Sequence, residues 1–504
     1  MPSLVSSKFR VYNADQFKEA LGEAAPSYLY MFIGRTRSWT DDNNPPTPID
    51  ATANTEFEHW RDMMSAKRVQ STDLSLVARR VDWTTGTVYT EYSHTADLNT
   101  ADFFVLTEDF NVYKCLFNDN GATSTTKPTG TSTTAITTAD GYIWKFMYTL
   151  TAADAVKFLT EDYIPVKTLS SDDGTTQWDV QAAAVNGSIE VVEVTNGGTQ
   201  FDNYNTGTLV SVANTTQMVI DAGASPVDNL YNTNTLYVTG GTGVGQQRTI
   251  SGYTGSSKTV VVGTAFTTLL DGTSTYSIAP TVAISGDGTL ATAIASMNVT
   301  SNTVYSMTVT AVGSSYTTAT VAVTGNGVSG VTGSAYVGPP SGHGADAAQE
   351  LMGYNVLLNT KFDKGESGTF TTGNDFRVIG LLRDPLLANG SSATASSYDQ
   401  STALTITGIS GTFTNDEIVT GGTSTTTGYV VQANTTLVNA TQTDGLFTVA
   451  ETLTGTDSGA TATVSVANNG PLLDFSGDIM YVEHRSPVSR AADQIEDVKL
   501  VIRF

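Results

Sequence analysis

Two long stretches of the chain carry almost no charge, and this feature constrains the fold more than any other. Residues 186–345 hold seven acidic and two basic side chains, and residues 401–469 hold five acidic and none that is basic. Gly, Thr, Ser and Val dominate, and in the first stretch short alternating runs such as SIEVVEV are separated by Gly-Gly, Asp-Gly or Asn-Gly pairs. Such alternation favours strands, and such pairs favour hairpin turns. We therefore expect chains of β-hairpins.

Each charge-poor stretch also repeats itself. Residues 282–288 return as 321–327 at an offset of 39 residues, and residues 411–421 return as 445–455 at an offset of 34. Two copies are too few for a solenoid, which needs at least about three repeats. The repeats therefore indicate duplicated β-modules.

The rest of the chain is richer in aromatic and charged side chains and carries the helix signals. Capping-box patterns predict short helices that begin after Asn13, Thr55 and Thr151. Alternating or apolar runs predict strands between them and at the end of the chain. These strands are expected over residues 28–33, 103–106, 112–117, 143–150 and 498–504.

The changes in composition divide the chain into domains. At 504 residues it exceeds the roughly 250–300 at which a single core stops growing. We expect residues 1–185, 346–400 and 470–504 to form one framework domain. Residues 186–345 and 401–469 are then two inserted all-β modules, and the fold class is mainly β.

The overall charge restricts the partners. A formal net charge of −24 and an isoelectric point near 4.3 repel phosphate backbones and anionic membranes, so neither nucleic acid nor membrane is expected as a partner. The first residues, MPSLVSSKFR, show no secretory signal, and no apolar run approaches the ~18 residues of a membrane span. We expect a protein made in a cytoplasm that stays there or leaves it inside a particle.

Residues that could act in catalysis or bind a ligand are scattered along the chain. Cys115, the single cysteine, lies in a strand-like run, where a buried inert thiol is favoured over a nucleophile. None of the four histidines has metal-ligand spacing; His343 could be a general base on a flexible loop, but a hinge where the first insert rejoins the framework is favoured. Gly240–Gly245 lacks the Lys and the helix of a phosphate-binding loop.

Neither the pairs of neighbouring acidic residues nor the tryptophans indicate a catalytic site. Adjacent acids such as Asp41-Asp42 and Glu496-Asp497 could suggest a glycosidase pair, but solvated turn acids are favoured in a chain with 49 acidic residues. No catalytic residue, metal ligand or cofactor-binding residue is expected, and hence no enzyme. The tryptophans singly suit core packing and together suit large surfaces for protein contacts. They are Trp39, Trp60, Trp83, Trp144 and Trp178.

Ordered blocks at both ends of the chain resemble a known family. In the first part they are Ser7–Arg10, Phe32–Arg35 with Trp39, Pro45–Pro48, Trp60–Met64, Arg79–Trp83, Val112–Leu116 and Asp140–Lys145. Later blocks are Phe376–Ile379, Asp384–Leu386 and Ser476–Arg485 with Pro487 and Asp493-Gln494. Together they cover roughly half of the chain and resemble the baseplate wedge subunit encoded by gene 8 in T-even-like contractile-tailed bacteriophages. The inserts resemble β-modules that cyanophages add to such proteins.

The resemblance implies a multilayer β-sandwich framework with a few short helices in loops, and a homodimer. It also implies a place in the tail baseplate of the virion, assembled in the host cytoplasm, with other baseplate wedge proteins as partners and no catalytic residues. The inserts depart from the family pattern and could make fibre or host-surface contacts. Two alternatives stay open: a receptor- or glycan-binding tail module at the baseplate periphery, and a polysaccharide-cleaving tail enzyme.

Overall fold

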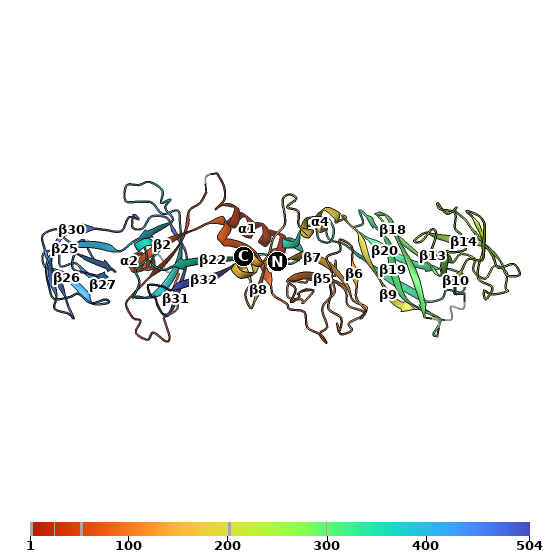
Figure 1. The fold of residues 1–504 in the computed structure, drawn as a ribbon, viewed down its shortest axis with the longest axis horizontal. Coiled ribbons are helices and arrows are strands. Elements are labelled where there is room, and N and C mark those ends of the chain that lie inside the picture. The colour runs from red at the N-terminus through yellow and green to blue at the C-terminus, as the bar shows by residue number, and fades with distance from the viewer. Residues whose placement is uncertain (1–3, 25, 51–53, 200–202, 299) are drawn as a thin grey trace. The chain divides into compact units, whose positions relative to one another are not determined.

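The protein is built mainly from strands. The structure, a computed structural model, describes residues 4–24, 26–50, 54–199, 203–298 and 300–504. Strands take up 43% of the chain and helices 9%, and the strands form several sheets (Figure 1). The predicted mainly β fold with a few short helices is confirmed.

By its internal contacts the chain divides into two compact units. Unit 1 consists of Met1–Val77 and Tyr354–Phe504, and unit 2 consists of Ala78–Gly353. The boundaries predicted near residues 185, 345, 400 and 469 follow composition rather than contacts. The grouping of 1–185, 346–400 and 470–504 into one framework stays a prediction.

The helices are short, and their starting points test the capping patterns. Thr151 caps its helix as predicted, because its hydroxyl accepts from the backbone N–H of Asp154 at 3.0 Å. The role predicted for Thr55 falls on a side chain outside the described residues. The helices are α1 (Ser7–Glu19), α2 (Asn54–Asp62), α3 (Ala152–Phe158), α4 (Thr176–Ala183) and α5 (Ala347–Glu350), with 3-10 turns at Ser71–Asp73 and Glu366–Gly368.

The prediction that a helix begins after Asn13 is wrong. Helix α1 begins at Ser7, where the hydroxyl of Ser6 accepts from the backbone N–H of Phe9 at 3.3 Å. Asn13 lies inside the helix, between the buried side chains of Val11 and Ala14. The burial of that face outweighs the local preference of Asn for a cap.

A five-stranded sheet of unit 1 joins segments from distant parts of the sequence. All six residues of its central strand are buried. Phe32 pairs with Gly380, where a Cβ atom would lie 2.2 Å from the phenyl ring, so only glycine leaves room for that ring. The strand order is β24 (Ser397–Asp399), β2 (Met63–Val69), β1 (Leu29–Gly34), β23 (Asp375–Arg383) and β31 (Asp478–Ser489).

A second group of strands in unit 1 holds the end of the chain. Strand β32 (Ile495–Arg503) pairs with β22 (Asn355–Asp363), which also pairs with β3 (Leu74–Arg79). Leu500 is buried, and Val498 and Ile502 are partly buried, whereas Arg503 is exposed. The predicted final strand is confirmed, whereas its alternation holds only in part, because Val501, expected on the exposed face, is partly buried like Val498 and Ile502.

The second charge-poor stretch forms a closed barrel. Thr420 and Thr454 are equivalent residues of the two sequence copies, and they pair directly across antiparallel strands. The two copies are therefore related by an approximate twofold axis. Phe413 and Phe447, also equivalent, are both buried in the barrel core. The barrel order is β25 (Thr402–Ser410), β28 (Leu437–Thr441), β27 (Thr427–Ala433), β26 (Ile418–Gly421), β29 (Thr452–Gly455) and β30 (Thr461–Asn468).

Unit 2 contains a small aromatic sheet and the strand β8. The predicted strands over 103–106, 112–117 and 143–150 all form, and Cys115 is buried with no exposed surface, as predicted. Burial raises the pKa of the Cys115 thiol well above its ordinary value, which keeps it unreactive. The sheet runs β4 (Phe104–Leu106), β5 (Asn111–Phe117), β7 (Ile143–Thr149) and β6 (Ile136–Thr137), and β8 spans Tyr163–Val166.

The first charge-poor stretch forms two further sheets of unit 2. Ala283 and Ala322, equivalent residues of the 39-residue repeat, pair directly with each other. One sheet runs β20 (Ala319–Thr324), β17 (Thr281–Gly286), β18 (Thr289–Asn298), β19 (Thr303–Ser314), β9 (Ile189–Gly197) and β21 (Val331–Val337). The other runs β10 (Asn205–Thr208), β16 (Thr275–Ala279), β13 (Thr235–Gly240), β14 (Gln247–Thr254), β15 (Thr259–Val262), β12 (Gln217–Val219) and β11 (Ser211–Asn214).

Candidate functional site

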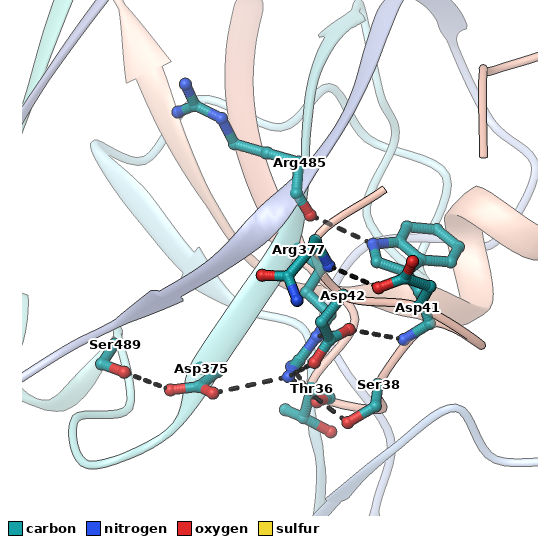
Figure 2. A network of polar contacts seen from close by, with 10 residues as sticks. Thr36, Ser38, Asp41, Asp42, Asp375, Arg377, Arg485 and Ser489 are labelled. Atoms are coloured by element: carbon teal, nitrogen blue, oxygen red, sulfur yellow. Dashed lines mark hydrogen bonds and ion pairs between the residues drawn. The ribbon is translucent and has the colours of Figure 1, made fainter. Parts of the chain in front are cut away.

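In unit 1 a buried arginine fixes the loop that follows β1. The guanidinium of Arg377 on β23 donates to both carboxylate oxygens of Asp42, at 2.9 and 2.7 Å (Figure 2). It also donates to the carbonyl of Thr36 and lies 3.5 Å from Asp375. Arg377 is 4% exposed, and its guanidinium lowers the pKa of Asp42 to about 2. Asp42 therefore stays ionised and holds the loop down at neutral pH.

The same loop presents Trp39 to the neighbouring strand β31. The indole N–H of Trp39 donates to the carbonyl of Arg485 at 3.1 Å, and the centroid of its ring lies 4.5 Å from that of the His484 ring. On the other side the guanidinium of Arg35 lies 3.9 Å from the Trp39 ring, within cation–π range. Arg35 in turn forms an ion pair with Asp62 at 3.3 Å. Residues 35–42 of the loop are therefore fixed to β23, to β31 and to the end of α2.

His59 lies on helix α2 and faces His484, the same histidine that Trp39 contacts. It is 5% exposed, and its ring is 5.8 Å from that of His484. Burial, and to a lesser extent the charge of His484, lowers the pKa of His59 to about 4. His59 is therefore neutral at physiological pH, which suits a core histidine more than a proton carrier.

Unit 2 contains buried ion pairs that join its aromatic sheet to the strand β9 and to helix α5. Lys114 on β5 bonds the carboxylate of Glu350 on α5, and Lys145 on β7 lies 3.1 Å from Glu190 on β9. All four side chains are at least nine-tenths buried. Burial lowers the pKa of Lys114 while Glu350 opposes that shift. A buried pair of this kind specifies one arrangement, because either charge alone would be strongly destabilising.

His343 belongs to the same buried cluster and is no flexible surface base. It is 2% exposed, its Nδ1 lies 3.9 Å from Glu350, and its ring meets the Tyr92 ring edge-on at 4.7 Å. Burial, together with Lys114 and Lys145, holds the pKa of His343 well below its ordinary value. The burial contradicts a base on an exposed loop, and the hinge interpretation stays a prediction.

A groove of about 500 Å³ opens beside the barrel in unit 1. Trp60, Met63 and Leu472 are buried and form its base, while Phe475 and Leu446 are 50% and 68% exposed and form its rim. Polar side chains share the lining. They are Arg61, Gln400, Thr402, Thr441, Gln442, Thr443, Asp444, Asn469 and Asp474.

The other residues selected from the sequence have structural surroundings. Gly240–Gly245 connects two antiparallel strands, β13 and β14, as the sequence predicted. The expectation that the paired acids are solvated holds for Asp41 and is wrong for Asp42 and for Glu496, which is 8% exposed and bonded by Arg490 at 3.0 Å. Asp42 showed no local signal, because Arg377 is 335 residues away, whereas Arg490 lies only six residues before Glu496.

The tryptophans contribute more to packing than to open surface. Trp144 is fully buried, and Trp60 is 4% exposed. Trp39, Trp83 and Trp178 are partly buried. The interpretation of single tryptophans as packing residues fits these positions best.

In the part of the chain that the structure describes, no cluster of three or more His, Cys, Asp or Glu side chains comes together in a way that could hold a metal ion. None of the helices described has both the length and the apolar character that a membrane crossing requires.

Comparison with known proteins finds no match. No protein-family model matches the chain, and no curated protein matches it either.

Proposed function

We propose that the chain is a structural subunit of the baseplate wedge in a contractile phage tail. In this role it links neighbouring wedge proteins during assembly in the host cytoplasm and remains in the virion. The proposal assigns it no catalytic step and no cofactor. Its partners are other wedge proteins and a second copy of the chain.

One observation carries this proposal: the sequence blocks that resemble the wedge family meet in space. Four blocks lie on or beside adjacent strands of one sheet although they are spread from residue 32 to residue 485: Phe32–Arg35, Trp60–Met64, Phe376–Ile379 and Ser476–Arg485. Their side chains and that of Trp39 form the contacts around the loop after β1. Because the blocks that resemble the wedge family together build one fixed site, they support an architecture like that of the family.

The blocks in unit 2 meet in the same way. Val112–Leu116 lies on β5 and Asp140–Lys145 leads into β7, and the two strands pair. Asp140 accepts from the backbone N–H groups of Thr125 and Thr126 at 2.7 and 2.8 Å, which explains why an acid precedes Gly141 there. Each unit thus holds its own cluster of family-like residues.

Immunogold electron microscopy tests the proposal. An antibody raised against the purified chain should label phage particles that encode it at the distal end of the tail. Label on the capsid, on the fibres alone, or only on unassembled material would contradict a place in the wedge. Pre-immune serum from the same animal is the matched control.

The homodimer is tested separately. Light scattering of the purified chain at micromolar concentration should give about twice the chain mass of 53.1 kDa. A monomer at that concentration would remove the self-association part of the proposal and leave the particle location to the labelling experiment.

A further inference from the structure

The groove beside the barrel holds a strained aromatic residue at its rim. Phe475 has a φ of 63°, in the left-handed region that a bulky residue rarely adopts, at a cost on the order of 1 kcal/mol. Glycine at this position would avoid the strain. The phenyl ring is nevertheless placed there, 50% exposed and lining the groove. Phe110 has a similar φ of 60° and a ring that is 44% exposed, so it is the position of Phe475 on the groove, more than the strain, that suggests a role in binding.

The backbone around Phe475 is held in place before any ligand arrives. The backbone N–H of Leu473 donates to the carbonyl of Leu386 at 2.8 Å, and the hydroxyl of Ser476 accepts from the backbone N–H of Leu386 at 3.0 Å. Phe57 meets the Phe475 ring edge-on, with ring centroids 4.3 Å apart. The backbone that carries the ring is therefore held in place, and a ligand would pay little backbone entropy to use it.

The polar side chains of the groove suit a ligand with many hydroxyl groups. Asp474 and Asn469 supply acceptors and an amide donor, and Arg61 supplies donors. Both carboxylate oxygens of Asp444 already accept from Thr427, at 2.6 and 2.8 Å, and each keeps a further lone pair for a ligand. Sugars present hydroxyl groups at their edges and C–H groups on their faces, and the latter pack on an aromatic ring. Two carboxylates with one guanidinium disfavour a phosphate or a polyanion. The volume of about 500 Å³ lies within the usual range of small-ligand sites.

An extended peptide fits the barrel side of the groove less well. A peptide strand binds by adding to an open sheet edge. Strand β28, which contributes Ala440 and Thr441 to the lining, is already paired on both sides, with β25 and with β27. The barrel therefore offers side chains to a ligand rather than an unpaired strand.

We propose that this groove binds a short neutral oligosaccharide, with one sugar face on the Phe475 ring and its hydroxyl groups on Asp444, Asn469 and Asp474. The binding site is independent of the proposed wedge function. A wedge subunit with such a groove would add contact with a host-envelope glycan to its structural role.

Isothermal titration calorimetry of the full chain tests the groove with three probes: maltotriose, cellotriose and N,N′-diacetylchitobiose. At least one should bind saturably. Phe475→Gly removes the ring and the strain together, so we expect unchanged or higher thermal stability and a loss of affinity of about tenfold or more. Phe9→Ala removes an equally exposed ring from α1, outside the groove, and should leave affinity unchanged.

Three results would overturn the proposal. One is that no probe binds at concentrations up to about 10 mM. Another is that Phe475→Gly and Phe9→Ala have the same effect on affinity. The third is that Phe475→Gly abolishes capture of a wedge protein from phage-infected cells while no sugar binds, which would reassign the groove to a protein partner.

Discussion

Two equivalent glutamates of the barrel offer the sharpest test of its internal symmetry. Glu417 accepts from the backbone N–H groups of Thr414 at 2.6 Å and Ser458 at 3.0 Å, so it ties the first copy to a turn of the second. Glu451 does the same in reverse, accepting from Thr448 at 2.6 Å and Ser424 at 2.8 Å. Each copy of the repeat thus caps a turn of the other.

The expected cost of breaking one cap follows from these contacts. Glu417 is 1% exposed and also accepts from the backbone N–H of Asp457 and the hydroxyl of Ser458. Hydrogen bonds to a charged group contribute about 1.5–3 kcal/mol each but do not add fully, and the exposed turn can be partly rehydrated. We expect Glu417→Ala to lower the local stability of the barrel by about 3–5 kcal/mol, and Glu451→Ala to do the same within about 1 kcal/mol.

Native-state hydrogen exchange read by mass spectrometry measures this effect, because it reports the opening free energy of β26 and β29 separately from the rest of the chain. Asp457→Asn is the matched control: it removes an exposed charge from the same turn and should change that free energy by less than about 0.5 kcal/mol. If Glu417→Ala behaves like Asp457→Asn, or if the two glutamates differ widely, the reciprocal capping argument is wrong.

Acid titration gives the same test a second readout. Burial by itself would raise the pKa of Glu417 and of Glu451, but the hydrogen bonds they accept outweigh it and hold both pKa values below the ordinary 4.5. Their contribution is therefore complete above pH 4.5 and is lost as pH falls through the lower folded-state pKa. Glu417→Gln should reduce this loss of stability; an unchanged pH profile would contradict the assignment.

Three further perturbations test the units. Arg377→Met leaves Asp42 without its partner and should destabilise unit 1 by about 3–5 kcal/mol in denaturant titration. The same substitution should cost less stability in a chain that already carries Asp42→Asn, and additive effects of the two substitutions would refute the coupling. Replacing residues 196–332 by Asn-Gly joins the paired ends of β9 and β21 through a two-residue turn and should leave a soluble chain. Aggregation of this variant on gel filtration would show that the deleted residues are needed for the fold of the rest. Leu500→Asp should unfold unit 1 in circular dichroism while Arg503→Asp is tolerated; equal effects would refute the alternation.

The sequence by itself determined the kinds of elements. Alternating runs and glycine turns predicted strands because a period of two and turn geometry are local properties of the chain. The burial of Cys115 and the cap at Thr151 followed from the same local patterns. The repeats also predicted duplicated modules before any strand pairing was known.

Tertiary structure alone decided which elements meet. Asn13 looked like a cap but lies inside α1, because burial of Val11 and Ala14 outweighs a local preference. The Arg377–Asp42 pair joins residues 335 positions apart. No pattern along the chain specifies such a partner, since it depends on which sheet edges pack together. For the same reason the groove with Phe475 at its rim had no sequence signal.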